Sequence, residues 1–308
     1  MCLLHNLNLE AATSTHTRTC CRDPIFSERA RESERTNSSE MAPLCLLYVL
    51  RHGRSLANEA SLIVSSEENG VKPEYALAPA GKEQAAAAGK LLADELLWLG
   101  ADADADATTA IRVTFYVSPF SRTVETAAIA AQAFEEAVAS AAAAAGTAAA
   151  TQTPRVLNLA GPPRVERALR ERWFGAALEL QNHDGYSPAW ASDAKDPSSR
   201  PPGQGDGESV REVAARCAEL LQRLAERHGG AGSGGEGGEE QEAQEAIVLV
   251  SHGDTLSILQ AAASGGGGGS LCEHRKFGLS TAELKRVGSL PDAARKAAEV
   301  AATGVAAR

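Results

Sequence analysis

The sequence lacks the features of a nucleic-acid-binding or membrane-spanning protein. Its 30 Lys and Arg are outnumbered by 40 Asp and Glu, which gives a formal net charge of -10. Non-specific nucleic-acid binding needs a surplus of basic residues, so this charge argues against it. The longest apolar candidate, residues 127–150, is mostly alanine and is interrupted by Glu135 and Glu136. It does not resemble a bilayer-spanning segment. We therefore expect no nucleic acid and no membrane among the partners.

Cysteine is sparse and irregularly spaced. The six cysteines contain no C-x-x-C pair and no regular framework, so neither a zinc ribbon nor a disulfide scaffold is supported. The first forty residues lack the continuous apolar core of a secretory signal. Together these absences favour a reducing compartment. We expect a cytoplasmic location, with organellar targeting by the N-terminal extension as the alternative, and Met41 as a second candidate start.

Short apolar runs alternate with helical patterns along the 308 residues. The composition, 44% hydrophobic and 23% charged, suits one sizeable core. Buried strands are predicted at residues 44–50, 111–117 and 247–250, with a weaker candidate at 155–159. Helices are predicted at residues 80–99, 124–139 and 209–227. This alternation predicts a layered α/β fold, in which ligands gather at the carboxyl ends of the strands.

The last of these helices has the clearest signals of its start and of its buried face. Ser209 and Glu212 have the spacing of a capping box, and apolar residues recur on one helical face. Cys217 lies on that face, so we predict that it belongs to the core.

Low-complexity segments set the expected domain limits. We predict a disordered N-terminal extension over residues 1–42, a single domain over 43–287 and a C-terminal tail over 288–308. Flexible insertions are expected near 140–152, 229–245 and 262–270, where extra loop length costs little closure entropy. Their glycines are not followed by G-K-[ST], so they do not form a nucleotide-binding P-loop.

Three predicted strands are each followed by residues suited to phosphate chemistry. Arg51-His52-Gly53 follows the first strand, the turn 118–126 with Arg122 follows the second, and Ser251-His252-Gly253 follows the third. A lone histidine at a strand end is more often structural than catalytic. Here, however, two histidines and at least two arginines are expected at one edge of the sheet. Amides that open the following helices would add donors for an anion.

The arginines favour a phosphate site over a metal site. A guanidinium about 4 Å from a cation repels it by several kcal/mol at an effective dielectric constant of about 20, and it attracts a phosphate dianion more strongly. The same positive charge should lower the pKa of His52 and keep a lone pair available for attack on phosphorus. We therefore expect no metal and no cofactor, and a small phosphorylated substrate as partner.

A proton donor for the leaving group is sought in the stretch 169–175, which contains Glu171 between Arg170 and Arg172. In one interpretation Glu171 belongs to an exposed ion-pair cluster. In the other, burial against Trp173 and Phe174 raises its pKa, so that it can donate a proton and later accept one from water. The residues alone leave both interpretations open.

These motifs together resemble the histidine phosphatase superfamily, which includes phosphoglycerate mutase-like enzymes. The resemblance covers residues 44–287, in the family's order, and rests on five segments: Arg51-His52-Gly53, residues 118–126, residues 169–175, Gly207-Glu208-Ser209 and Ser251-His252-Gly253. It implies a single-domain, three-layer α/β/α sandwich around a mostly parallel mixed sheet.

The resemblance also implies roles for particular residues. His52 would be phosphorylated and Glu171 would transfer the proton, while phosphate would be bound by Arg51, Asn58, Arg122, His252 and Gly253. Mutases of the family commonly carry asparagine where this chain has Asp254, and residues 59–75 contain no clear equivalent of their substrate-binding stretch. We therefore favour a metal-independent phosphomonoester hydrolase over a mutase. An inactive phosphate-binding module is the alternative from another class.

Two further groups of residues are candidates for contacts with the substrate. Four arginines near Glu171 hint at a second anionic group, although such a run is usually a solvated face; they are Arg164, Arg167, Arg170 and Arg172. Tyr186, Trp190 and the proline-rich stretch 197–202 are candidates for a lid. The sequence identifies neither the substrate nor the oligomeric state.

Overall fold

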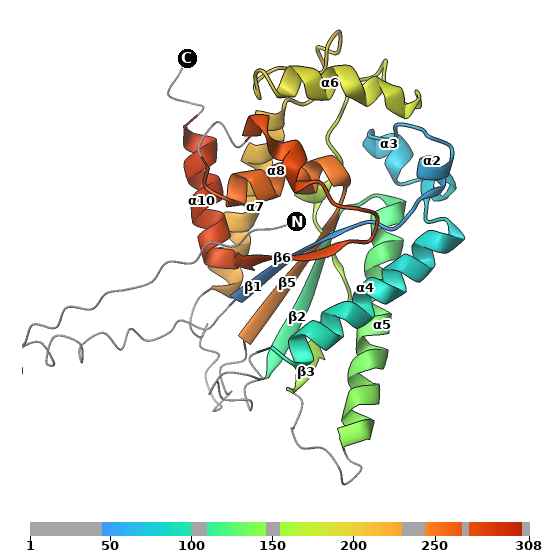
Figure 1. Cartoon of the computed structure of the whole chain (residues 1–308), viewed down its shortest axis with the longest axis vertical. Coiled ribbons are helices and arrows are strands. Elements are labelled where there is room, and N and C mark those ends of the chain that lie inside the picture. The colour runs from blue at the N-terminus through green and yellow to red at the C-terminus, as the bar shows by residue number, and fades with distance from the viewer. Residues whose placement is uncertain (1–44, 100–109, 146–154, 230–243, 267–270, 304–308) are drawn as a thin grey trace, which may run out of the picture. The chain divides into compact units, whose positions relative to one another are not determined.

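A six-stranded mixed sheet forms the centre of the computed structural model, which describes residues 45–99, 110–145, 155–229, 244–266 and 271–303 (Figure 1). The main path through the sheet is β3-β2-β5-β1-β6, and β4 also pairs with β2. All pairs are parallel except β1 with β6. The strands are β1 (Cys45–Arg51), β2 (Ile111–Val117), β3 (Leu157–Leu159), β4 (Arg164–Val165), β5 (Gln244–Ser251) and β6 (Leu284–Ser289).

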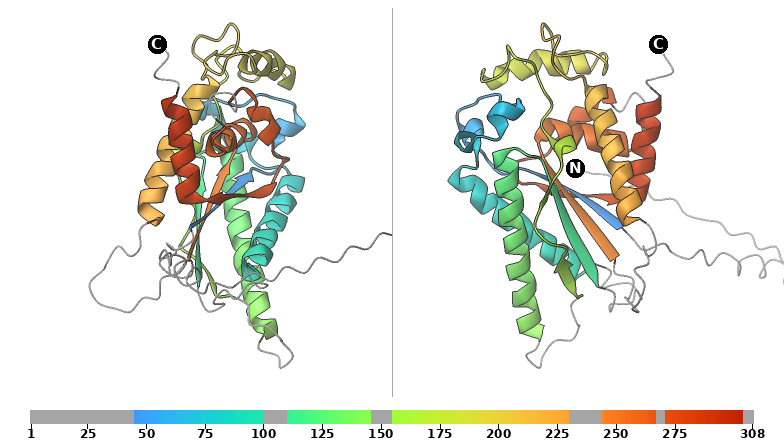
Figure 2. Two further views of the ribbon diagram at one scale, coloured as in Figure 1. Left: turned by 60° about the vertical axis from the view of Figure 1, so that its left-hand side comes forward. Right: turned by 180° about the vertical axis from the view of Figure 1, so that it is seen from behind.

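Helices cover both faces of this sheet (Figure 2). Alternate residues of β1 point into different cores: Leu47 packs with α7, α8 and α10, whereas Leu46 packs with α4 and α5. The longer helices are α4 (Pro79–Leu97), α5 (Ser121–Ala145), α6 (Tyr186–Asp193), α7 (Val210–His228), α8 (Gly253–Ala263) and α10 (Leu290–Ala302). The short ones are α2 (Leu56–Glu59), α3 (Glu67–Gly70), η1 (Pro73–Tyr75), η2 (Arg167–Leu169), η3 (His183–Gly185) and η4 (His274–Phe277).

The predicted α/β class with a mostly parallel mixed sheet is confirmed, and several elements lie where the sequence placed them. Strand β2 has the predicted limits. The capping box of α7 is formed, because the Ser209 hydroxyl accepts the Glu212 N–H while the Glu212 carboxylate accepts the Ser209 N–H. Cys217 is fully buried in the core beneath this helix.

The sequence analysis missed the C-terminal part of the fold. Residues 288–308 were predicted as a tail, but β6 runs to Ser289 and α10 follows directly, with Leu290, Ala297 and Val300 buried. Strand β6 has no apolar run, so it shows no strong pattern until it pairs with β1. The signals of α10 are local and were overlooked: Ser289 caps the helix, Pro291 lies in its first turn, and its buried residues recur on one face. The expected insertion near 140–152 begins as the last turn of α5.

The predicted insertions near 229–245 and 262–270 extend too far, because Gln244 and Glu245 belong to β5 and Ala262 and Ala263 to α8. Residues 146–154, 230–243 and 267–270 and the predicted extension 1–42 lie outside the described residues. Across the described ranges, no helix combines the length and the apolar character needed to cross a membrane.

A glycine sets the distance between α4 and α5. A Cβ on Gly89 would collide with the carbonyl oxygen of Ala130 on α5. Alanine normally stabilises a helix interior relative to glycine by about 1 kcal/mol. Here the backbone contact reverses the sign, because the two helices would have to move apart.

We predict that Gly89→Ala lowers the free energy of unfolding by about 1–3 kcal/mol, the usual cost of overpacking. Urea-induced unfolding followed by circular dichroism measures it. Lys90→Ala, at an exposed position of the same helix, should change stability by less than about 0.5 kcal/mol. A Gly89→Ala protein as stable as the parent would contradict the close-approach argument.

Candidate active site

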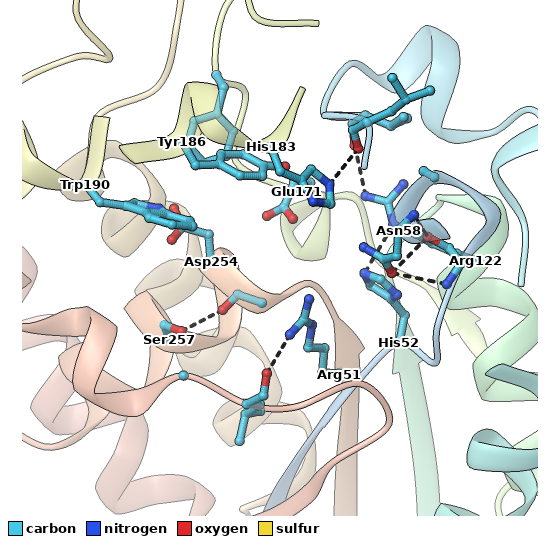
Figure 3. Close-up of a pocket in the computed structure, with 18 of the residues that line it drawn as sticks. Arg51, His52, Asn58, Arg122, Glu171, His183, Tyr186, Trp190, Asp254 and Ser257 are labelled. Atoms are coloured by element: carbon cyan, nitrogen blue, oxygen red, sulfur yellow. Dashed lines mark hydrogen bonds between the residues drawn. The ribbon is translucent and has the colours of Figure 1, made fainter. Parts of the chain in front are cut away.

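The ends of β1, β2 and β5 bring the predicted basic residues to one edge of the sheet, where Arg51, His52 and Arg122 line a pocket; His252 is fully buried beside them and does not line it. His52 follows β1, Arg122 lies in the first turn of α5 after β2, and His252 precedes α8 after β5. Because these strands are parallel neighbours, their carboxyl ends share one edge of the sheet. The pocket has a volume of about 310 Å³, and Arg51, His52, Asn58, Arg122, Glu171 and Gly253 line it (Figure 3).

His52 is held as a neutral imidazole. Its Nδ1 lies 2.8 Å from the carbonyl oxygen of Gly53, which can only accept, so Nδ1 carries the proton. Nε2 therefore has the lone pair, and Arg122 Nε donates to it over 3.3 Å. Burial lowers the pKa of His52 well below its ordinary value, and the charges of Arg122 and Arg51 lower it further.

His252 packs against His52, with the ring centroids 5.3 Å apart. Its Nδ1 accepts a hydrogen bond of 3.0 Å from Arg122 Nη2, which leaves the proton on Nε2, 2.8 Å from the Ser118 hydroxyl. Burial lowers the pKa of His252 as well, and the charge of Arg122 lowers it further. Both imidazoles are therefore neutral, and the guanidinium between them carries the positive charge.

Two arginines retain unused donors at the pocket. Arg122 Nη2 donates to the carbonyl oxygen of Val64 over 2.9 Å, and Arg51 Nη1 donates to that of Leu279 over 2.6 Å. Buried Arg122 Nη1 and Arg51 Nε have no hydrogen-bond partner among the described residues. A buried N–H without an acceptor is costly, so these groups are suited to an anion entering the pocket.

Two glycines allow the close packing of this edge. A Cβ on Gly53 would collide with the backbone of Gly81 in α4, and one on Gly253 would lie 3.2 Å from Cζ of Arg51. Gly253 thus leaves room for the guanidinium beside the first turn of α8. The glycines that follow His52 and His252 in the sequence therefore have a packing role in the structure.

Asn58 lies on the pocket wall as part of the capping box of α2. Its carboxamide oxygen accepts from the backbone N–H and the hydroxyl of Ser55, at 3.1 and 3.0 Å. The oxygen is thus fully engaged. The NH2 group is the part of Asn58 that remains for a ligand.

Glu171 is buried, not part of an exposed ion-pair cluster. Its Oε1 accepts from the Arg172 N–H at 2.9 Å and the Thr255 hydroxyl at 3.2 Å, while Oε2 lies 3.9 Å from His252 Nδ1. Burial raises the pKa of Glu171, the negative charge of Asp254 raises it further, and Arg122 opposes both. A carboxyl group in this environment can hold a proton at higher pH than an exposed one.

The four arginines near Glu171 do not form a second anion site. Arg170 pairs with Glu208, and Arg167 pairs with Glu67 at the surface. Arg164 donates to the Tyr116 hydroxyl on β2. None of the four lines the pocket. They stabilise the fold around Glu171 instead of offering a free charge to a ligand.

Arg172 is fully buried in a row of four charged groups. It donates to both oxygens of Asp193, at 2.6 and 2.9 Å, and to Asp254 at 3.2 Å. Asp254 also accepts from Arg275 at 3.2 Å. Burial alone would raise the pKa of Asp254, but His274 and the two arginines outweigh it and keep the pKa below its ordinary value.

Helix α6 and the turn before it supply the opposite wall of the pocket. Tyr186 stacks on Trp190 with the centroids 5.1 Å apart, and the guanidinium of Arg275 lies 3.8 Å from the Trp190 ring centroid. Both aromatic residues named as lid candidates therefore line the pocket. Arg275, His183, Asp184 and Ser257 also line it and were not predicted, because no local motif marks them before the chain folds.

A carboxylate outside the pocket holds the segment that fixes Arg122. Glu179 accepts five hydrogen bonds of 2.7 to 3.1 Å, from the backbone and hydroxyl groups of Ser65 and Ser66 and from the Asn69 side chain. The residue before Ser65 is Val64, whose carbonyl oxygen binds Arg122. Glu179 thereby positions one support of the guanidinium.

Glu179→Ala should therefore weaken binding of inorganic phosphate by roughly ten- to a hundredfold, since small misplacements of a binding group are costly. Isothermal titration calorimetry with inorganic phosphate measures the loss. Glu74→Gln, an exposed change on η1, serves as the control and should bind like the parent. Unchanged phosphate affinity in a folded Glu179→Ala protein would show that Val64 holds its position without the carboxylate.

Within the described residues, no three His, Cys, Asp or Glu side chains are grouped so that they could hold a metal ion.

Comparison with known proteins identifies the class of this chain. Residues 47–145 and 140–295 match the model of the histidine phosphatase superfamily, branch 1. The chain belongs to the histidine phosphatase superfamily. Phosphatase-type or mutase-type phosphoryl transfer is the class of activity that this membership supports. No curated protein matches the sequence.

Solved structures match the chain at low sequence identity. "Mycobacterial hydrolase 1" and a mycobacterial glucosyl-3-phosphoglycerate phosphatase in complex with VO3 are each 22% identical, with a TM-score of 0.49, and each match covers 79% of this chain and 90% of the other. The product of an open reading frame from Mycobacterium tuberculosis is 21% identical, with a TM-score of 0.42, and covers 78% and 89%. Similarity at this level does not indicate which substrate this chain takes.

Proposed function

We propose that the protein is a phosphomonoester hydrolase that works through a phosphohistidine on His52. The observation that carries the proposal is the lone pair of a neutral, buried imidazole beside two guanidinium groups with unused N–H donors. A phosphoryl group at this position would accept from Arg51 and Arg122 while its phosphorus faces His52 Nε2. Positioning and charge stabilisation of this kind supply most of the catalysis in phosphoryl transfer.

In the first step, Nε2 of His52 gives up its hydrogen bond from Arg122 Nε and uses the lone pair to form a bond to phosphorus, while the bond from phosphorus to the ester oxygen breaks. Arg51 and Arg122 bind the oxygens of the transferring group. The leaving alkoxide takes a proton from Glu171, which lies across the pocket from His52 and is protonated to higher pH because it is buried. The product alcohol then departs.

In the second step, a water molecule attacks the phosphorus and gives its proton to the Glu171 carboxylate. The bond between phosphorus and His52 breaks, phosphate leaves, and both residues return to their starting states. The tautomer of His52 supports both steps, since the Gly53 carbonyl keeps the proton on Nδ1 throughout. No protein-bound metal takes part in the proposed steps.

His52→Ala should abolish hydrolysis of p-nitrophenyl phosphate, because the nucleophile is lost. The assay is run with a chelator present, and mass spectrometry of the acid-labile adduct reports phosphate on His52 in the parent. His228→Ala, on α7 outside the pocket, is the control and should retain activity. Equal turnover by the parent and His52→Ala would eliminate the proposal, and phosphate binding without turnover would indicate an inactive binding module.

Glu171→Gln tests the proton donor separately from the nucleophile. Hydrolysis of an alkyl phosphate should fall by about a hundredfold to ten-thousandfold, the usual contribution of general acid catalysis. Hydrolysis of p-nitrophenyl phosphate should fall much less, because its leaving group needs no proton. In the parent, activity on the alkyl ester should decline as pH rises through the raised pKa of Glu171 and the acid form is lost. An equal loss on both substrates would refute this role for Glu171.

A further inference from the structure

The half of the pocket facing away from His52 is differently charged from the phosphate end. Trp190 and Ser257 lie across the pocket from His52 and Arg122 (Figure 3). Beyond the phosphate end, the polar side chains that line the pocket are those of His183, Asp184, Tyr186, Trp190, Asp254, Ser257 and Arg275, and Arg275 is the one cation among these described residues. The charges and hydrogen-bonding groups of these residues therefore determine which alcohol portion of a phosphate ester the pocket can bind.

The charge of Arg275 is already balanced. Its guanidinium pairs with Asp254 at 3.2 Å and lies on the Trp190 ring. Asp254 in turn pairs with Arg172, and Arg172 with Asp193. These four residues contribute two positive and two negative charges, and His274 lies 3.4 Å from Asp254, so neither carboxylate of the row is left unpaired.

One carboxylate in this half is unbalanced. Asp184 lies in the η3 turn beside His183, and its side-chain oxygens have no hydrogen bond or ion pair with any described residue. A substrate carboxylate or second phosphate placed beside Asp184 would be repelled by this unpaired carboxylate, less strongly than in a buried site because Asp184 is exposed to solvent. The outer half is therefore unfavourable for a substrate with two anionic groups.

The unpaired polar atoms in this part of the pocket are acceptors on His183, Asp184 and Ser257 and one donor, the buried Trp190 Nε1, which has no partner among the described residues. His183 Nε2 donates to the Leu62 carbonyl over 2.9 Å, which leaves Nδ1 as an acceptor. The Ser257 hydroxyl donates to the Gly253 carbonyl over 2.6 Å, which leaves its oxygen lone pairs. The Asp184 carboxylate accepts only. Hydroxyl groups supply donors to all three.

We propose, on the basis of the phosphohistidine mechanism above, that the substrate is a monophosphate ester of a neutral, hydroxyl-rich alcohol. The phosphate occupies the end formed by Arg51, His52 and Arg122. The hydroxyl groups of the alcohol bind the acceptors of His183, Asp184 and Ser257. The unpaired carboxylate of Asp184 disfavours phosphorylated acids and bisphosphates, and with them mutase chemistry on such compounds.

Two esters that differ in one group test the proposal directly. Glycerol 3-phosphate and 3-phosphoglycerate have the same three-carbon skeleton and differ in CH2OH against COO⁻. We expect kcat/KM for glycerol 3-phosphate to be at least about threefold higher, since the carboxylate of the acid is placed near that of Asp184. Equal rates, or a preference for the acid, would overturn the proposal. A preference for phosphoethanolamine over glycerol 3-phosphate would overturn the neutral character of the alcohol.

Asp184→Asn isolates the source of the preference. Removing the unbalanced charge should reduce the ratio between the two esters by at least about threefold, mostly through a lower KM for 3-phosphoglycerate. Glu219→Gln makes the same change in net charge on an exposed position of α7, outside the pocket, and should leave the ratio unchanged. An unchanged ratio in Asp184→Asn would remove this residue from the argument.

Failure of the substrate class and failure of the mechanism are distinguishable. If p-nitrophenyl phosphate is hydrolysed but the acid is preferred, the mechanism stands and the substrate class falls. If nothing is hydrolysed, calorimetric binding of the two esters to the parent protein still measures the preference, and tighter binding of 3-phosphoglycerate would refute it.

Discussion

The guanidinium of Arg122 between two buried imidazoles is the constraint on which the site depends. It donates to Nε2 of His52 and to Nδ1 of His252, and it can do so only while both rings are neutral at those atoms. The buried guanidinium therefore requires that Nε2 of His52 and Nδ1 of His252 carry no proton. The Gly53 carbonyl and the Ser118 hydroxyl fix the remaining ring nitrogens. The result is a positively charged pocket whose central imidazole keeps a lone pair.

This arrangement requires support from segments distant in the sequence. Val64 supplies a carbonyl to Arg122, and Glu179 holds the serines that follow Val64. Leu279 supplies a carbonyl to Arg51 from the chain that leads into β6. Because each guanidinium is only partly satisfied by these contacts, donors remain for an anion. The support thus orients the arginines without consuming their binding capacity.

The two ends of the pocket are electrostatically different because of how charges are paired. At the phosphate end, Arg51 and Arg122 face the neutral imidazoles and a carboxyl group of raised pKa. At the other end, Arg172 and Arg275 are matched by Asp193 and Asp254. A buried pair of this kind contributes little net charge, so its value lies in fixing α6 and η4 around the pocket. One end is thus suited to phosphate and the other to a neutral group.

The sequence by itself determined the α/β class, the main strands and the basic residues at the strand ends, because apolar runs and strand-end motifs are local patterns. It could not choose between an exposed and a buried Glu171, since flanking arginines look the same whether they pair with it or, as here, with Glu208 and Asp193. It also missed α10, β6, Arg275 and Asp184. Strand β6 and Arg275 have their places only through packing, because their partners β1 and Asp254 lie tens to hundreds of residues away along the chain. Tertiary structure alone decided which charges are balanced and which remain for a substrate.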